Sequence, residues 1–208
     1  MKIRRKTFDL VLTLGGAVLT VVLIAAGSLL MWGYSYTNSN VHDQLAMQQI
    51  YFPSKAAFAH AKPGTEITPS MIPSVSQYAG QQLLTGPQAE VYANDFIAVH
   101  LSEMPYHGVY AKVSAAARAA KPGTPQAAQL TQLENTVFQG TTLRGLLLEA
   151  YAFSTIGEIA FIASIISFIL AGVMLILTLL GLTHWRRVPE DVEFPKERHH
   201  KEEVPQAA

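Results

Sequence analysis

Two long uncharged apolar segments dominate the pattern of hydrophobic and polar positions along the chain. They cover residues 10–33 and 159–183, and neither contains Asp, Glu, Lys or Arg. A helix rises about 1.5 Å per residue, so each segment could cross a hydrocarbon layer roughly 30 Å thick. The remaining chain is too short to cover two such helices as the core of a soluble domain. The pattern therefore predicts two transmembrane helices.

The first apolar segment raises the alternative of a cleaved signal peptide. "MKIRRK" has the positive charge typical of the start of such a peptide. However, the apolar part of a signal peptide is only about 7 to 15 residues long, and no small-residue cleavage site precedes "MWGYSY". We therefore expect residues 10–33 to be retained as a transmembrane anchor.

The distribution of basic residues predicts how the two helices are oriented. Lys and Arg concentrate before the first helix and directly after the second, whereas residues 34–154 carry nearly balanced charges. Basic residues beside a transmembrane helix favour the cytoplasmic side, so residues 1–9 and 184–208 should both be cytoplasmic. Aromatic residues suited to the two membrane interfaces flank the helices: Trp32, Tyr34, Tyr36 and Trp185.

Helix start and stop signals divide residues 34–154. Asn40 is a candidate cap for a helix over "VHDQLAMQQIY", which Pro53 would end. Thr68 followed by Pro69 predicts another helix, with Gly80 as its stop.

Thr85 and Gln88 have the spacing of a capping box and predict a helix over residues 87–102. In a competing interpretation, "FIAVHL" and "GVYAKV" form a β-hairpin, because Ile97, Val99 and Leu101 alternate with other residues. The following "SAAARAA" is strongly helix-forming, which favours helix.

The last part of this segment predicts further helices. Thr124 and Pro125 start an amphipathic helix that Gly140 would end, and "TLRGLLLEAYAF" forms another. Thr155 and Glu158 resemble a capping box, so the second transmembrane helix is expected over residues 155–183. The predicted fold is an all-α membrane protein in which two transmembrane helices flank an extracytoplasmic helical bundle at 34–154. The mixed, proline-containing tail at 184–208 should be disordered.

The composition argues against some classes of function but does not identify one. The formal net charge is zero, so nothing suggests a nucleic acid partner. The chain has no cysteine, and the outer segment must therefore be held by packing rather than by disulfides. Together with the absence of an N-x-S/T sequon, this fits a protein of a bacterial plasma membrane.

No catalytic or metal-binding motif is recognisable. Four histidines lie in the outer segment, but their spacing matches no compact ligand motif: His42, His60, His100 and His107. A nucleophile elbow and phosphate-binding glycine loops are also absent. We therefore expect neither enzymatic activity nor a metal or other cofactor.

Two features of the second apolar segment bear on partners. Glu158 could serve a transport path, but its capping-box position offers a simpler role at the start of the helix. Small residues recur every fourth position, which allows another helix to approach closely, either within the chain or from a second copy. This set comprises Ala163, Ser167 and Ala171, with a partial counterpart in Gly16, Thr20 and Ile24.

The amide- and tyrosine-rich stretch at 77–101 suggests a polar contact surface. On composition alone, the residues chosen for it are Tyr78, Gln81, Gln82, Tyr92, Asn94 and Asp95. The resulting hypothesis is an outer domain that senses or docks an envelope component, with a protein partner or a homo-oligomer in the bilayer. The alternative is a small-molecule-binding or transport-related subunit that acts as an oligomer.

Three stretches of residues 1–187 also resemble a group of uncharacterised two-span membrane proteins of actinobacteria: "VHDQLAMQQIYFP", "QYAGQQLLTGPQAEVYANDFIAVHL" and "TVFQGTTLRGLLLEAYAFSTIG". The resemblance implies an envelope protein of this architecture. Some members are named for an aromatic ring-opening dioxygenase, an iron enzyme that needs two histidines and a carboxylate. No such trio is identifiable here, and this activity is not carried over.

Overall fold

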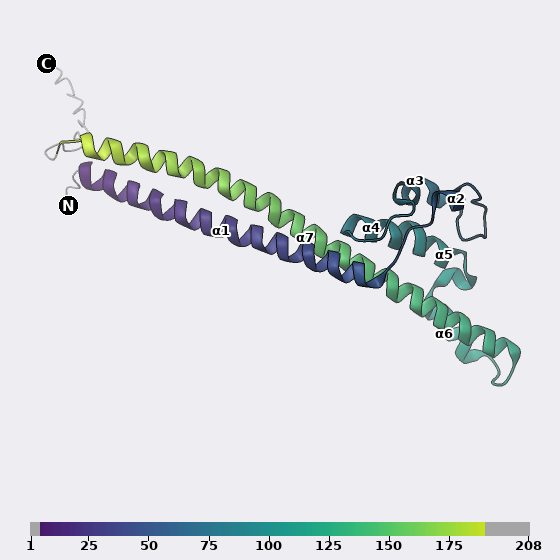
Figure 1. Cartoon of the computed structure of the whole chain (residues 1–208). Helices are drawn as coiled ribbons and strands as arrows, with labels where there is room; N and C mark the ends of the chain where they lie inside the picture. Colours follow the sequence, from purple (N-terminus) through teal and green to yellow (C-terminus); the bar gives the residue numbers. More distant parts are fainter. Residues whose placement is uncertain (1–4, 190–208) are drawn as a thin grey trace, which may run out of the picture. The chain divides into compact units, whose positions relative to one another are not determined.

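The computed structural model describes residues 5–189, and regular secondary structure within this range is helical (Figure 1). A single isolated bridge pairs Tyr51 with Gln82. The predicted all-α class is therefore confirmed. The elements are α1 (Arg5–Gln48), α2 (Lys55–Phe58), η1 (Pro69–Met71), α3 (Ile72–Val75), η2 (Ser76–Tyr78), α4 (Gly86–Val91), η3 (Tyr92–Ile97), α5 (Ala98–Glu103), η4 (Pro105–Gly108), α6 (Tyr110–Ala119) and α7 (Pro125–Arg187).

Both predicted membrane segments lie within very long helices. α1 and α7 are each long and apolar enough to cross a membrane. The chain divides into two compact units, one formed by the described residues of 1–29 and 163–208, and the other by residues 30–162. We call these the helix-pair unit and the inserted unit.

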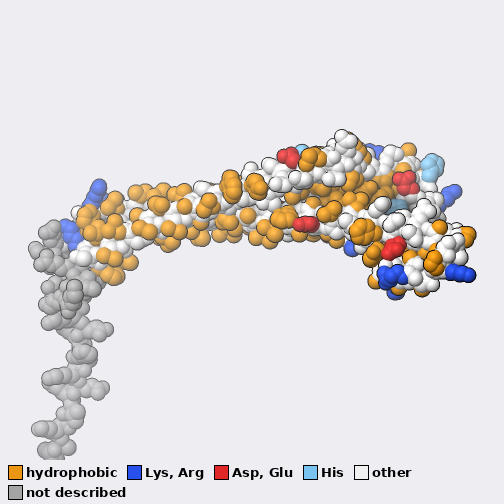
Figure 2. All heavy atoms as spheres, turned by 90° about the horizontal axis from the view of Figure 1, so that it is seen from below, with side chains coloured by type: hydrophobic (Ala, Val, Ile, Leu, Met, Phe, Trp, Pro, Cys, Tyr) orange, Lys and Arg blue, Asp and Glu red, His pale blue; other side chains and the backbone are white. Residues whose placement is uncertain are grey.

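In the helix-pair unit, small and hydroxyl side chains are buried, while large apolar side chains are exposed. α1 and α7 lie side by side, with Ser164 fully buried and Ser167 nearly so. A Cβ added to Gly27 would lie only 3.1 Å from the Phe168 ring, so a larger residue would require this ring to shift. Val, Leu and Ile side chains face outward, and Figure 2 shows them covering the visible face of this unit.

One end of the helix-pair unit is basic. Arg5, Arg186 and Arg187 are exposed there, and the Lys6 ammonium lies 5.8 Å from the centroid of the Trp185 ring. Cation–π contacts of this kind favour a tryptophan beside basic residues. This end thus combines the Lys and Arg residues with the aromatic side chain expected at a cytoplasmic interface.

The inserted unit has a conventional apolar core. Met71, Val75, Leu83, Val113 and Val137 are fully buried in it. They come from η1, α3, α6, α7 and the segment before α4, so the short elements are joined to the long helix by packing. Burial of apolar area of this kind is the main favourable contribution to folding in water.

The segment from Gly86 to Glu103 confirms the predicted capping box and helix. The Thr85 hydroxyl accepts a hydrogen bond from the Gln88 amide, and the Gln88 side chain accepts one from the Thr85 amide at 3.1 Å. The helix runs through α4, η3 and α5, of which η3 is a π-helix. The competing hairpin is wrong, because residues 97–101 are helical and α6 occupies "YAKVSAAARA".

Several predicted helix boundaries are wrong. α1 does not begin again at Asn40 but continues to Gln48, because Val41 and Leu45 pack into the core of the inserted unit. α7 begins at Pro125 as predicted, yet it passes through Gly140. A glycine inside a helix costs only about 0.5 to 1 kcal/mol relative to alanine, which the packing of Val137 on the same helix offsets.

The predicted capping box at Thr155 and Glu158 is also wrong. Both residues lie in the interior of α7, and the Thr155 hydroxyl donates to the Tyr151 carbonyl at 3.0 Å. The cap explanation for Glu158 therefore fails, and its side chain is exposed.

The stretch after Thr68 is helical but irregular, divided among η1, α3 and η2, and Gly80 follows it with φ +74°. The prediction of a disordered tail at 184–208 is wrong for residues 184–187, which form the last turn of α7. Residues 1–4 and 190–208, which belong to the predicted cytoplasmic ends, lie outside the described residues.

Candidate docking groove

A groove with a volume of about 550 Å³ lies between α1 and α7 in the inserted unit. Its floor is apolar and belongs to the core, since Val41, Leu45 and Leu147 are buried. Its edges leave large side chains in the open: Tyr36 and Leu146 are each 59% exposed and Phe153 is 51% exposed. The groove is therefore an apolar surface that the inserted unit itself does not cover.

The lining residues follow the spacing of a helix–helix contact. On each helix four of them recur at alternating intervals of three and four residues, as at the a and d positions of a coiled coil. These positions are Thr37, Val41, Gln44 and Gln48 in α1, and Leu143, Leu146, Ala150 and Phe153 in α7. Each helix thus presents to the groove a stripe of the kind that packs against another helix.

A different face of the same two helices is already covered by the short elements. Gly86 of α4 contacts Ser154, and a Cβ at this glycine would collide with the serine side chain. Leu101 of α5 contacts Gly140, whose added Cβ would lie 3.0 Å from a leucine methyl carbon. The short helices therefore occupy the small-residue face of α7 and leave its Leu146 face free.

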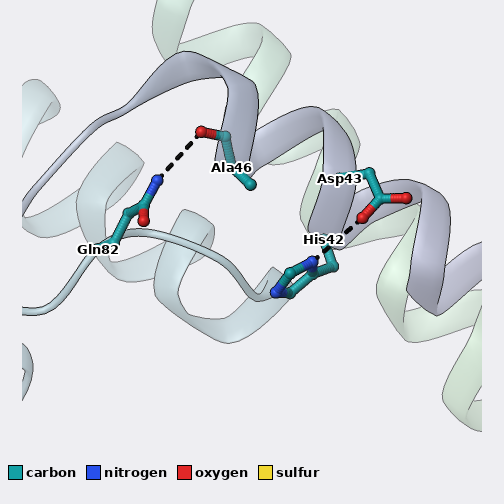
Figure 3. Close-up of polar contacts among 4 residues, drawn as sticks. All are labelled: His42, Asp43, Ala46 and Gln82. Carbon is teal, nitrogen blue, oxygen red and sulfur yellow. Dashed lines mark hydrogen bonds and ion pairs between the residues drawn. The ribbon is translucent and has the colours of Figure 1, made fainter.

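Two hydrogen bonds strengthen this arrangement. The Arg144 guanidinium donates to the Asn94 side-chain oxygen at 2.9 Å. The Gln82 amide donates to the Ala46 carbonyl in the last turn of α1 at 3.0 Å, as Figure 3 shows. Because the last carbonyls of a helix lack partners within it, this contact caps the end of α1.

The residues that line the groove include one acid, Glu149, and no Lys or Arg. Residues 30–48 and 145–162 contain Asp43, Glu149 and Glu158 and no Lys or Arg. Asp43 is paired with His42 at 3.3 Å (Figure 3). Glu149 lines the groove, and no salt bridge joins it to another described residue.

A shallower hollow of about 360 Å³ adjoins the groove through Tyr36 and Asn40. It is formed by one face of α1, where the rings of Trp32 and Tyr36 stack with centroids 5.6 Å apart. Asp43 closes its other end. The exposed aromatic surface of the inserted unit thus continues along α1 towards Trp32.

The six residues chosen from composition are not gathered in this groove. Tyr78 and Tyr92 pack on Phe52, with ring centroids 5.1 and 5.3 Å away. Gln81 accepts from the Gln88 side chain at 3.1 Å. With Gln82 bound to Ala46 and Asn94 to Arg144, five of the six make contacts within the inserted unit, and Asp95 is half-buried.

Tyr92 lies in an apolar environment. Burial of the side chain and, secondarily, the negative charge of Glu66 raise the pKa of Tyr92 above its ordinary value of 10.0. Its ring lies 4.7 Å from that of Phe96, which places the phenol within an aromatic cluster. Tyr92 therefore acts as a packed, neutral side chain at physiological pH.

The small residues noted in the second apolar segment lie at or near the contact with α1. The Ser167 hydroxyl donates to the Leu23 carbonyl at 2.8 Å, and Ala171 is buried. Ala163 is half-buried. On α1, Thr20 is buried and an added Cβ at Gly16 would lie 2.7 Å from the Thr178 hydroxyl, whereas Ile24 is 46% exposed.

Within residues 5–189, no group of three or more His, Asp or Glu side chains is arranged to hold a metal ion. The His100 ring nitrogen Nδ1 lies 2.8 Å from the Phe96 carbonyl in the preceding turn of its helix. His107 Nδ1 is 3.3 Å from the Ser102 carbonyl. These two histidines therefore have local backbone partners.

Sequence reasoning missed the groove residues because it divided both long helices. The signal was available in the alternating three- and four-residue spacing of Leu143, Leu146, Ala150 and Phe153. Comparison with protein-family models, curated proteins and solved structures finds no match for the chain. The geometry and charge of the groove are therefore the basis for assigning a function.

Proposed function

We propose that the protein is an integral plasma-membrane protein that docks a partner protein through the groove between α1 and α7. In this proposal both chain ends are cytoplasmic, and the inserted unit is extracytoplasmic. The proposal needs no catalytic step, and it places the contact surface at the groove rather than on the amide-rich stretch at 77–101.

The exposed apolar rim of the groove carries the proposal. Leu146 and Phe153 belong to a well-packed helix, yet about half or more of each side chain is open to solvent. An apolar surface with polar neighbours is typical of a protein interaction site. Aromatic side chains such as Tyr36 and Phe153 are enriched at such interfaces.

The membrane location is supported by the helix-pair unit. Its outward-facing Val, Leu and Ile side chains would be costly in water but suit a lipid environment. Its basic end matches the charge bias of the cytoplasmic side.

A membrane-impermeant maleimide tests this topology, because the chain has no cysteine of its own. In intact cells, Lys121→Cys should be labelled and Arg186→Cys should react only after permeabilisation. The reverse result would contradict the orientation.

Photo-crosslinking from single cysteines tests docking in native membranes. Leu146→Cys places the probe in the groove, and Phe138→Cys is a matched control, since Phe138 is 54% exposed on the same helix but does not line the groove. We expect protein adducts from position 146 and few from position 138. Equal adduct formation at both positions would contradict a groove-specific partner.

The same experiment tests the small-molecule alternative. The groove volume lies within the range of small-molecule sites, roughly 300 to 1,000 Å³, which favours a bound apolar compound. A low-mass adduct in place of a protein adduct at position 146 would support that alternative and contradict protein docking.

A further inference from the structure

We propose that the groove receives a transmembrane helix of another protein, one that extends beyond the bilayer and carries a Lys or Arg opposite Glu149. This inference rests on the docking function proposed above and specifies the chemistry of the partner.

The dimensions of the groove suit a helix. Its lining runs from Tyr36 to Gln48 along α1 and from Leu143 to Phe153 along α7. At about 1.5 Å per residue these stretches are roughly 18 Å and 15 Å long, or about three helical turns. A helix laid in such a groove inserts apolar side chains at intervals of three and four residues, which matches the spacing on both walls.

An exposed apolar stripe continues along α7 beyond the groove, within the inserted unit. Beyond Phe153, Ile156 and Ile159 are 60% and 62% exposed, and the uncharged segment begins at residue 159. A partner helix longer than the groove could cover these side chains as well. A soluble peptide would leave this stripe uncovered.

Charge complementarity specifies the partner further. Glu149 lines an otherwise largely apolar surface without an ion pair to another described residue. No Lys or Arg lines the groove, and the nearby Arg144 donates to Asn94. A carboxylate that loses water on docking is stabilised by an opposite charge.

A second copy of the same face would bring another Glu149 and no Lys or Arg from residues 30–48 or 145–162. Like charges across an interface oppose association. The charge pattern thus favours a different, basic partner over a homodimer through this face.

A charge-swap experiment with the full chain in phosphatidylcholine vesicles tests the inference. The probe is a synthetic transmembrane peptide with three further helical turns, leucines at alternating three- and four-residue intervals, and one lysine. A sister peptide has glutamate in place of the lysine. Energy transfer from a labelled peptide to a fluorophore on Phe138→Cys, which lies outside the groove, measures association.

The lysine peptide should bind about three- to tenfold more tightly than the glutamate peptide. Glu149→Lys should reverse this preference. Glu103→Lys, an exposed acid on α5 that does not line the groove, should leave the preference unchanged. Leu146→Asp should weaken the binding of both peptides.

The other outcomes separate this inference from the docking function. Both peptides could bind in a way that depends on Leu146 but not on the charge at position 149. This result would contradict a basic partner and leave the docking function intact. Association with neither peptide would overturn the helical partner, while protein adducts at position 146 in native membranes would still support docking.

Two further results would contradict the proposed occupant and identify a different one. Energy transfer between labelled copies of the protein, abolished by Leu146→Asp, would identify a second copy in the groove. Adducts from Leu146→Cys that contain only lipid, even with the lysine peptide present, would identify a lipid.

Discussion

The helix-pair unit and the inserted unit bury opposite kinds of side chain. In the helix-pair unit the buried positions include Thr20, Ser164 and Ser167, while valines, leucines and isoleucines lie outside. In the inserted unit the large apolar Met71 and Leu83 are fully buried, as such side chains often are in globular proteins. The same chain therefore follows two packing rules.

In the proposed topology, the difference between the units follows from their solvents, lipid for the helix-pair unit and water for the inserted unit. Water drives apolar side chains together, so a water-exposed domain buries its largest ones. Lipid does not distinguish a leucine from its own hydrocarbon, and helices there associate through close packing of small residues and hydrogen bonds. The groove departs from this rule within the inserted unit, because Leu146 and Phe153 remain exposed.

Truncation of leucine should reveal this difference most strongly. Leu83→Ala removes a fully buried side chain and should destabilise the inserted unit by roughly 2 to 5 kcal/mol. Leu175→Ala, at a position 48% exposed in the helix-pair unit, should cost only about 0.5 kcal/mol. Amide hydrogen exchange of α4 and α7 in the full chain measures both effects. Equal losses of stability at the two sites would contradict a difference in solvent between the two units.

A charge on the outer face of the helix-pair unit should be nearly as harmful. Val173 is 49% exposed near the middle of the uncharged segment, and Val173→Lys should oppose membrane insertion by about 3 kcal/mol. Ala115→Lys, on the exposed face of α6, should have little effect. Alkaline extraction of membranes measures the inserted fraction. Full insertion of the Val173→Lys protein would argue against lipid at this face.

Removal of the hydrogen bond between α7 and α1 should have a modest effect. Ser167→Ala loses the donation to the Leu23 carbonyl and should weaken helix pairing by about 0.6 kcal/mol. Ser28→Ala is the control, because Ser28 is exposed and bonds within its own helix. Energy transfer between labels on the two helices reports the change. If energy transfer is unchanged in the Ser167→Ala protein, packing alone holds α1 and α7 together.

The smallest effect at neutral pH should come from Tyr92. Burial and the charge of Glu66 raise its pKa, so above about pH 10 the unfolded state loses this proton while the folded state retains it. The free energy of unfolding then falls as the pH rises, until the folded phenol also ionises. Ultraviolet absorbance follows the ionisation of tyrosines as the pH rises. In the Tyr92→Phe protein, the tyrosine transition at the highest pH should be absent.

Glu66→Gln should move this transition to lower pH, because it removes the negative charge that opposes phenolate formation. Glu103→Gln serves as the control, since Glu103 does not contribute to the raised pKa of Tyr92. An unchanged titration in the Glu66→Gln protein would leave burial as the whole cause.

The sequence was sufficient for features that depend on neighbouring residues. Long uncharged segments identified the two long helices, and the Thr85–Gln88 capping box and the Pro125 start were correct, because a cap acts within one turn. The predicted start at Asn40 and the predicted stop at Gly140 failed. Their local cost is small compared with the packing of residues distant in sequence, such as Leu45 and Val137.

Only the tertiary structure decided which polar side chains make contacts within the protein and which apolar side chains are exposed. Gln82 and Asn94 were predicted as surface residues but bond to α1 and α7, whereas the apolar Leu146 and Phe153 line an open groove. The exposure of a helix face depends on whether another element covers it. That covering is set by α4 and α5 packing on one face of α7 and not on another.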